Sequence, residues 1–269
     1  MTDRFDYRPE TLFSLGRETI LVTGAAGQLG SSIVNGLLDC NALVIATDTS
    51  MSQLVECANK YGWDKETVLL KECDIRDLAS ISNAINNNAG SFAHVTGLVA
   101  NAGVSVFEPY LERTEESIDW VMNVNMKGTL LCIQEFIKYR KSHDGGGSIV
   151  NIASHYGVVS PDPRIYTDCD RKNSEIYSAT KAGIIQMTKY FAVHATEYGI
   201  RTNAVSPGGI RNPDSPQGEN FQQNYGYRCP MRRMAETHEL IGAVLFLLSP
   251  AASYINGQNI VVDGGTTCW

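Results

Sequence analysis

The 269-residue sequence has no apolar run long enough to cross a membrane and no surplus of positive charge. Its 22 Lys and Arg residues are outnumbered by 29 Asp and Glu residues, which gives a net charge of −7. Nucleic-acid binding needs a surplus of Lys and Arg against phosphates, so this balance disfavours it. The first ten residues, MTDRFDYRPE, resemble neither a signal peptide nor a transit peptide. We therefore expect a cytoplasmic protein that binds neither membranes nor nucleic acids.

The sequence also lacks the spacings of a disulfide framework or a metal site. Its seven cysteines are scattered, with no C-x-x-C pair among them. This pattern fits reduced thiols in a cytosolic protein, and most of them are expected to be buried. The five histidines have no metal-ligand spacing with acids or cysteines. We therefore expect no bound metal.

What the sequence does contain is an alternation of short β-rich runs with longer segments of helical spacing. Several runs are apolar without alternation, as in strands buried on both faces of a parallel sheet. No repeat or low-complexity linker interrupts the alternation. It predicts a single α/β domain over residues 1–269, with a Rossmann-like doubly wound parallel sheet of about seven strands and helices on both faces. The expected strands are 20–23, 42–47, 68–70, 97–100, 148–152, 202–205 and 259–262.

Three segments fall outside this alternation. Residues 1–17 are expected to form an N-terminal tail that lies against the body. Residues 156–175 and 208–232 are rich in Pro, Asp, Asn and Arg. Loops of this length in a compact domain are usually functional lids or disordered segments. We expect the second of them to form a substrate lid.

A glycine-rich turn follows the first expected strand. It reads Thr23-Gly24-Ala25-Ala26-Gly27-Gln28-Leu29-Gly30, and a helix starts at once. Glycines here let the backbone turn tightly and approach a pyrophosphate, which then sits on the helix N-terminus. The sequence therefore predicts dinucleotide binding by Gly24, Gly27, Gln28, Leu29 and Gly30.

An acid, Asp48, ends the second expected strand. A carboxylate at this point would hydrogen-bond the ribose hydroxyls of adenosine and repel a 2′-phosphate. No Lys or Arg adjoins it to bind that phosphate. NAD is therefore favoured over NADP, although Asp48 could also be an ordinary turn residue before a helix.

Tyr177 and Lys181 are four residues apart in a helical pattern, so their side chains project from one face. A free phenol has a pKa of about 10 and is a poor acid or base at neutral pH. A nearby ammonium, together with the positive oxidised nicotinamide, would lower that pKa. Tyr177 could then exchange a proton with a carbonyl or alcohol oxygen as a hydride moves. Ser154, after the strand at 148–152, could hydrogen-bond the same oxygen.

These residues together resemble the short-chain dehydrogenase/reductase family, from about residue 13 to 265. The resemblance lies in the glycine turn, Ser154, Tyr177-Ser178-Ala179-Thr180-Lys181, Asn101-Ala102-Gly103, Pro207-Gly208 and Val262-Asp263-Gly264-Gly265. The length and the last motif are typical of the shorter branch. One departure is that Gln28 stands where many members of that branch have their middle glycine. The spacing with Gly27 is more like that of sugar-nucleotide epimerases and dehydratases in the longer branch.

The resemblance implies further roles. Asn125 would be the fourth catalytic residue and would anchor a water leading to Lys181. The family's members are commonly tetramers, so we expect a homo-oligomer, either a dimer or a tetramer. The remaining cofactor residues implied are Asp74 and Ile75 along the adenine, Asn101, Ala102 and Gly103 on the cofactor floor, and Pro207, Gly208 and Ile210 near the nicotinamide.

The gap between Ser154 and Tyr177 is longer than the family usually shows, so residues 156–175 form an insertion near the site. Arg164 in this insertion and Arg211 after the Pro-Gly loop could bind a phosphate or carboxylate, or could be solvated loop charges. His155 adjoins Ser154 and could line the pocket. With the insertion and Ser206–Ile210, the chain resembles oxidoreductases of bacterial surface-glycan and flagellin-modification pathways. We therefore predict NAD-dependent hydride transfer to or from a sugar or polyol.

Three other functions remain open. A 3-oxoacyl-type or other carbonyl reductase has the same catalytic residues but usually prefers NADP and a more apolar lid. A sugar dehydratase or epimerase would fit the glycine spacing. A regulator that senses NAD without turnover is the non-enzyme alternative. The complete Tyr, Lys, Ser and Asn set argues against a sensor, which has no use for a tuned phenol.

Overall fold

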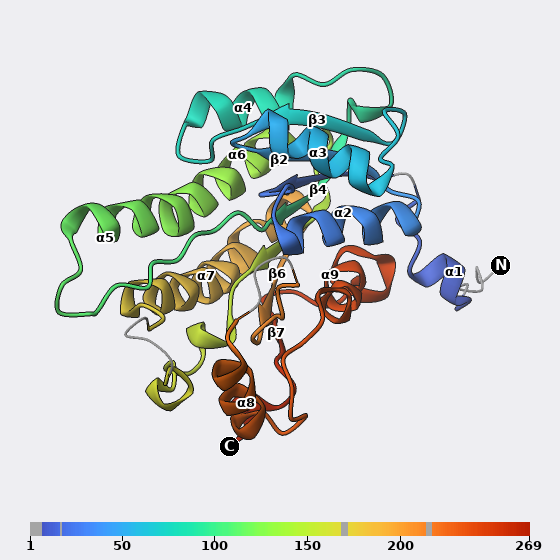
Figure 1. The fold of residues 1–269 in the computed structure, drawn as a ribbon. Coiled ribbons are helices and arrows are strands. Elements are labelled where there is room, and N and C mark those ends of the chain that lie inside the picture. The colour runs from blue at the N-terminus through green and yellow to red at the C-terminus, as the bar shows by residue number, and fades with distance from the viewer. Residues whose placement is uncertain (1–6, 17, 168–171, 214–216) are drawn as a thin grey trace.

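A seven-stranded parallel sheet forms the centre of the computed structural model, which describes residues 7–16, 18–167, 172–213 and 217–269 (Figure 1). The strand order is β3-β2-β1-β4-β5-β6-β7, which confirms the predicted doubly wound fold. The order reverses between β1 and β4, and ligands bind beyond the carboxyl ends of the strands at such a point. The strands are β1 (Thr19–Thr23), β2 (Leu43–Asp48), β3 (Val68–Glu72), β4 (Val95–Ala100), β5 (Gly147–Ile152), β6 (Ile200–Pro207) and β7 (Asn259–Val262).

Helices cover both faces of this sheet (Figure 1). One face carries α2, α3 and α9, and the other carries α4, α6 and α7. A π-helical turn, Met122–Gly128, joins α5 to α6. The helices are α1 (Pro9–Leu12), α2 (Gln28–Asp39), α3 (Met51–Tyr61), α4 (Leu78–Asn86), α5 (Glu115–Val121), α6 (Thr129–Lys141), α7 (Glu175–His194), α8 (Glu219–Arg228) and α9 (Ile241–Leu248).

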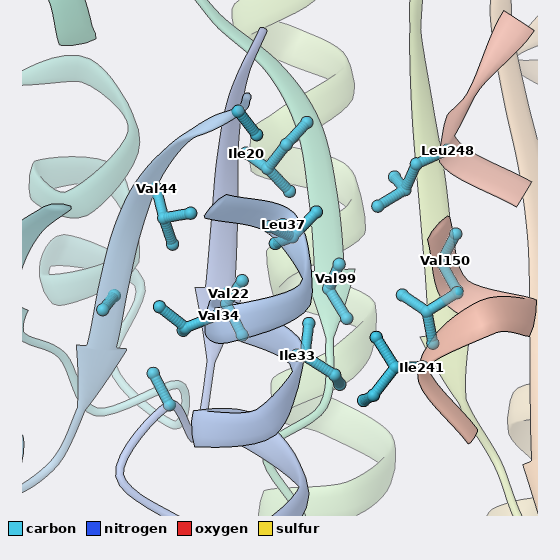
Figure 2. Packing of buried hydrophobic residues seen from close by; sticks show 14 of the residues in the cluster. Ile20, Val22, Ile33, Val34, Leu37, Val44, Val99, Val150, Ile241 and Leu248 are labelled. Atoms are coloured by element: carbon cyan, nitrogen blue, oxygen red, sulfur yellow. The ribbon is translucent and has the colours of Figure 1, made fainter. Parts of the chain in front are cut away.

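The core on the first face holds α2, the helix that follows the glycine turn. Ile33, Val34 and Leu37 of α2 are fully buried against Val22 of β1 and Val44 of β2 (Figure 2). Burying an aliphatic side chain of this size stabilises a fold by about 1.5–3 kcal/mol. This packing holds the N-terminus of α2 at the carboxyl edge of the sheet.

The two long segments 156–175 and 208–232 pack against each other. Part of 208–232 is the helix α8, and 156–175 contains short 3-10 turns. Asp162 pairs with Arg228 at 2.8 Å across the two segments. We call the described residues of 156–175 and 208–232 the cap. Its small apolar core, which includes Met234 just beyond it, consists of Ile165, Tyr166, Phe221, Tyr225, Cys229 and Met234.

The described part of the N-terminal tail lies against the body. Leu15 is buried in the core of the first face, and the Phe13 ring lies 6.4 Å from that of Phe246 in α9. Residues 1–6 and 17 of the predicted tail lie outside the described residues. None of the described helices is long and apolar enough to cross a membrane.

Candidate active site

The glycine turn has the geometry of a pyrophosphate cradle. Gly24 has a φ of +66°, and a Cβ atom there would lie 2.9 Å from the Cα atom of Ala102. A Cβ atom at Gly30 would overlap the Gly24 carbonyl oxygen. Gly27 has an ordinary φ of −71° and is the N-cap of α2. The turn therefore needs glycine at 24 and 30, and it leaves the N-terminus of α2 open to an anion.

Gln28, the departure from the shorter branch, links this turn to the cap. Its Nε2 atom donates to the carbonyl oxygen of Arg211 at 2.6 Å and to Oγ1 of Thr237 at 2.9 Å. A glycine could make neither bond. The shifted glycine spacing therefore has a local structural reason and does not by itself indicate the longer branch.

A cavity of about 530 Å³ extends from the turn across the ends of β2 and β3. The Asp48 carboxylate lies in it and accepts hydrogen bonds from the backbone N–H groups of Ala26 at 3.1 Å and Thr49 at 2.8 Å. Asp74 and Arg76 line the same cavity and form an ion pair at 2.6 Å. The Arg76 guanidinium holds the pKa of Asp74 below its usual value. Although no Lys or Arg adjoins Asp48 in sequence, the fold thus brings Arg76 into its cavity.

Asn101 holds the floor of this cavity. Its Nδ2 atom donates to the carbonyl oxygens of Thr23 at 2.9 Å and Gly24 at 3.0 Å. Thr23 Oγ1 in turn accepts hydrogen bonds from the backbone N–H groups of Asn101 and Ala102. Asn101 therefore ties the end of β4 to the glycine turn. These hydrogen bonds occupy its side-chain amide and shape the cradle.

The predicted catalytic residues meet in an adjoining cavity of about 330 Å³. Ser154 and Tyr177 share a side-chain hydrogen bond. Lys181 Nζ lies 5.5 Å from the centre of the Tyr177 ring and donates to the Ile152 carbonyl oxygen at 2.8 Å. Gly103 leaves room beside this ammonium, because a Cβ atom there would lie 3.4 Å from Nζ. The structure thus brings together the end of β5, the start of α7 and the loop after β4.

Burial is the main influence on the pKa values of Tyr177 and Lys181. Burial raises the pKa of Tyr177, and the Ser154 hydrogen bond opposes that rise. Burial also lowers the pKa of Lys181, from 10.5 to about 8. Without cofactor, desolvation is therefore the larger effect on the Tyr177 pKa, and the lowering expected from Lys181 together with the oxidised nicotinamide stays a prediction.

Asn125 lies in the π-helical turn, buried beside the other predicted catalytic residues. Its Oδ1 atom accepts from the backbone N–H of Val104 at 2.8 Å, and its Nδ2 atom donates to the Val104 carbonyl oxygen at 2.9 Å and to Thr180 Oγ1 at 3.2 Å. These bonds position the loop after β4 against α7. The water that Asn125 was expected to anchor stays a prediction.

The Pro207–Ile210 segment closes the far side of the catalytic cavity. Ile210 forms a parallel bridge with Ala235, in which Gly209 accepts and Arg211 donates the hydrogen bonds. The N–H and carbonyl groups of Ile210 therefore face the other way. The carbonyl accepts from Gln217, and the N–H has no acceptor among the described residues. This free donor fits the expected contact with a carboxamide.

A third cavity, of about 290 Å³, lies under the cap and shares Ser154, Tyr177, Gly208 and Ile210 with the second. His155 lines it, with Nδ1 3.0 Å from the Pro207 carbonyl oxygen. The sequence did not single out its other polar residues, although all of them lie in 156–175, expected near the site, and 208–232, expected to form a lid. These residues are Tyr156, Tyr166, Asn173, Asn212, Gln217 and Tyr225.

Of the two alternatives for Arg164 and Arg211, the structure favours loop charges over anion binding. Arg164 pairs with Asp162 at 2.8 Å, and its side chain is 71% exposed. Arg211 pairs with Glu236 at 2.7 Å. Neither guanidinium belongs to the lining of the third cavity. An anion-binding role does not follow, because each charge already has a carboxylate partner.

A further hollow of about 900 Å³ lies at the opposite edge of the sheet. It is lined by the tail and by Arg140 and Arg201, whose guanidinium groups donate to backbone carbonyls. None of the predicted catalytic residues reaches it. Among the described residues, no group of three or more His, Cys, Asp or Glu side chains could hold a metal.

Comparison with known proteins agrees with this site. A family model described as enoyl-(acyl carrier protein) reductase matches residues 24–267. D-threitol dehydrogenase of Mycolicibacterium smegmatis is 31% identical, with 95% of each chain covered. NADH-dependent L-xylulose reductase of Ambrosiozyma monospora is 32% identical, with 98% of this chain and 99% of that protein covered.

Among solved structures, a short-chain dehydrogenase from Leptospira borgpetersenii with bound NAD⁺ has a TM-score of 0.85 and 34% identity. The match covers 99% of this chain and 98% of that one. The named relatives are polyol and ketose enzymes, so the likeness to surface-glycan and flagellin-modification enzymes stays untested. With the glycine turn, the Ser154–Tyr177–Lys181 cluster and these matches, the chain belongs to the short-chain dehydrogenase/reductase family of oxidoreductases.

Proposed function

We propose that this protein interconverts a secondary alcohol of an uncharged polyol and the corresponding ketose, with NAD preferred over NADP. The single observation that carries the proposal is the cavity beside Tyr177, whose described lining is polar but holds no acidic or cationic side chain. The polyol and ketose names of the relatives support the same substrate class.

The lining of this cavity matches a polyhydroxyl compound. It combines hydroxyl and amide groups, which can donate and accept, with the rings of Phe107 and Phe221. A charged substrate group would be buried there without a counter-ion, which is unfavourable. A 3-oxoacyl chain would leave the polar groups unpaired, which also costs free energy. A small neutral polyol avoids both costs, because it buries no charge and its hydroxyls can pair with the polar groups.

His155 supplies an oriented acceptor for this substrate. Because Nδ1 faces a carbonyl oxygen, that nitrogen carries the proton and Nε2 is the acceptor. Burial lowers the pKa of His155 and keeps the ring neutral. Nδ1 is the ring nitrogen that makes a hydrogen bond to a described residue, which leaves Nε2 as the atom to which a substrate hydroxyl can donate.

Proton transfer is assigned to Tyr177. In oxidation its phenolate takes the hydroxyl proton, and in reduction its phenol gives a proton to the carbonyl oxygen. Ser154, which is hydrogen-bonded to Tyr177, is placed to hold the same substrate oxygen. Lys181 is mostly protonated at pH 7 because its pKa is about 8, and its charge favours the phenolate. The nicotinamide supplies or accepts the hydride when the cofactor is bound.

The preference for NAD rests on the charges around Asp48. Its carboxylate lies in the adenosine part of the cofactor cavity and would repel a 2′-phosphate. Arg76 is the cation in that cavity, but the Asp74 carboxylate neutralises it through contacts of 2.6 and 3.0 Å. A phosphate would therefore meet one unpaired negative charge and no unpaired positive one among the described residues.

The test is turnover with a panel of neutral polyols and pentuloses, sugar phosphates and 3-oxoacyl thioesters, each with NAD(H) and NADP(H). We expect activity with neutral polyols or ketoses, mainly with NAD(H), and its loss in Tyr177→Phe with the NAD affinity retained. His155→Leu should raise KM for the polyol more than KM for NAD. Preferred turnover of phosphates or acyl thioesters would overturn the substrate assignment. Cofactor binding without turnover across the panel would favour the dehydratase or the sensor.

A further inference from the structure

The adenosine end of the cofactor cavity has a wall that the family motifs do not include. The cavity runs from the glycine turn past Asp48 to Asp74, Ile75 and Arg76, because β1, β2 and β3 are neighbours in the sheet. A dinucleotide with its pyrophosphate on α2 and its ribose at Asp48 must place adenine in this end. Ile75 and Val124, both nearly buried, give this part of the cavity an apolar surface.

Trp120 lies on the outer side of the same cavity. It belongs to α5, one helical turn before Val124, so the two side chains project from one face. Its side chain lines the cavity although it is 42% exposed. The neighbouring exposed residues of α5 are the acids Glu115, Glu116 and Asp119. The exposed residues of α5 near the indole are therefore acidic, and the place of Trp120 in the cavity calls for an explanation.

We propose that Trp120 is the outer wall of the adenine subsite and packs its indole against the adenine base. This inference rests on the proposed binding of a nicotinamide dinucleotide but not on the substrate. The indole provides a broad flat surface, and an adenine base provides another, so the two can stack or meet edge to face. Arg76, which is held by Asp74, borders the same subsite as a fixed cation.

The stacking predicts a measurable share of the cofactor affinity. Aromatic side chains that stack on bases contribute about 1–3 kcal/mol per base, which corresponds to about fivefold to 150-fold in affinity. Because Trp120 stays partly exposed, we expect the lower part of this range, about fivefold to tenfold. The contact involves adenine alone, so affinity for the nicotinamide half should not change.

The experiment uses ADP as the probe, which fills the adenosine end without the nicotinamide. The full-length protein is titrated with ADP while tryptophan fluorescence is followed, and ADP affinity is measured separately by calorimetry. The wild type, Trp120→Phe, Trp120→Ala and the control Trp269→Phe are compared. Trp269 is 72% exposed and lies outside the cofactor cavity, so it is a matched surface tryptophan.

We expect ADP to change the fluorescence of the wild type and of Trp269→Phe, and not that of Trp120→Phe. Trp120→Ala should bind ADP about fivefold to tenfold more weakly, and Trp120→Phe should recover most of the loss. Equal ADP affinity in wild type and Trp120→Ala, with the fluorescence change unaltered in Trp120→Phe, would overturn the proposal. Absence of ADP and NAD binding to the wild type would instead remove the dinucleotide site. If ADP binds but no polyol is turned over, the substrate proposal fails and the assignment of Trp120 to the adenine subsite is unaffected.

Discussion

Lys181 is a buried cation with little to compensate it. Its side chain is 4% exposed, and its one described hydrogen bond is to the Ile152 carbonyl oxygen. The difference between a pKa of 10.5 and about 8 corresponds to about 3 kcal/mol by which the fold disfavours the charged form. This cost to the free energy of folding is fully present below pH 8, where Lys181 is charged in both the folded and the unfolded chain. It is relieved as pH rises toward 10.5, because the unfolded chain then binds a proton that the folded chain has lost.

We therefore expect Lys181→Met to abolish turnover and yet stabilise the protein without cofactor at pH 7. The gain should be about 1–2 kcal/mol, since the unpaired Ile152 carbonyl takes back part of it. It should shrink between pH 8 and 10.5. Denaturant unfolding at pH 7 and 9.5 measures both effects. Lys189→Met, at an exposed position of the same helix, is the control and should shift stability by less than about 0.5 kcal/mol. A destabilised Lys181→Met at pH 7 would contradict this account.

At the scale of elements, the cap owes its position to contacts between its two halves. Asp162 pairs with Arg228 of α8, and Asn224 of α8 donates to Thr167 Oγ1 at 2.9 Å. These contacts join segments that precede and follow Tyr177 in the sequence. The polar sequence of α8, ENFQQNYGYR, does not predict a helix by its apolar pattern, because mainly Phe221 and Tyr225 supply the buried face.

Cutting this connection should loosen the substrate cavity without touching the cofactor. We expect Arg228→Gln to raise KM for the polyol about twofold to fivefold, as partly exposed ion pairs contribute about 0.2–1 kcal/mol. The NAD affinity should stay unchanged. Arg164→Gln is the matched control, since Arg164 pairs with the same Asp162 from within its own half. Equal effects of the two substitutions would mean that Asp162 acts locally and does not join the halves.

At the scale of the whole molecule, apolar side chains remain exposed on the single chain. Val193 and Tyr190 of α7 are 72% and 55% exposed, and β7 is the last strand at its edge of the sheet. Exposed apolar groups and an uncovered strand edge favour association. We propose a homo-oligomer, in which copies of the chain cover these surfaces.

Sedimentation velocity checks this proposal directly. We expect a mass that is a multiple of the 29.4 kDa chain, and a smaller mass for Val193→Glu at equal concentration. The matched control is Val55→Glu on α3, which is also a valine exposed on a helix, at 44%. A monomeric wild type would refute the oligomer. An unchanged mass for Val193→Glu would show that Val193 of α7 is not part of the contact between copies.

The sequence by itself determined the sheet, the glycine turn and the pairing of Tyr177 with Lys181. These features have local causes: apolar runs form buried strands, glycine alone permits the turn at Gly24, and a spacing of four places two side chains on one helix face. The seven strands were therefore found, with the ends of six of them misplaced by one or two residues.

The tertiary structure alone decided the environment of each charge. The sequence shows that Arg164 and Arg211 are cationic. Packing decides that their carboxylate partners are Asp162 and Glu236. The raised pKa of Tyr177 likewise comes from burial, which outweighs the opposing hydrogen bond of Ser154. Trp120 is one exposed aromatic residue in sequence and becomes part of a cavity only in the folded chain, where α5 packs on α7. Burial and partners depend on segments that are distant in the chain, which no local pattern contains.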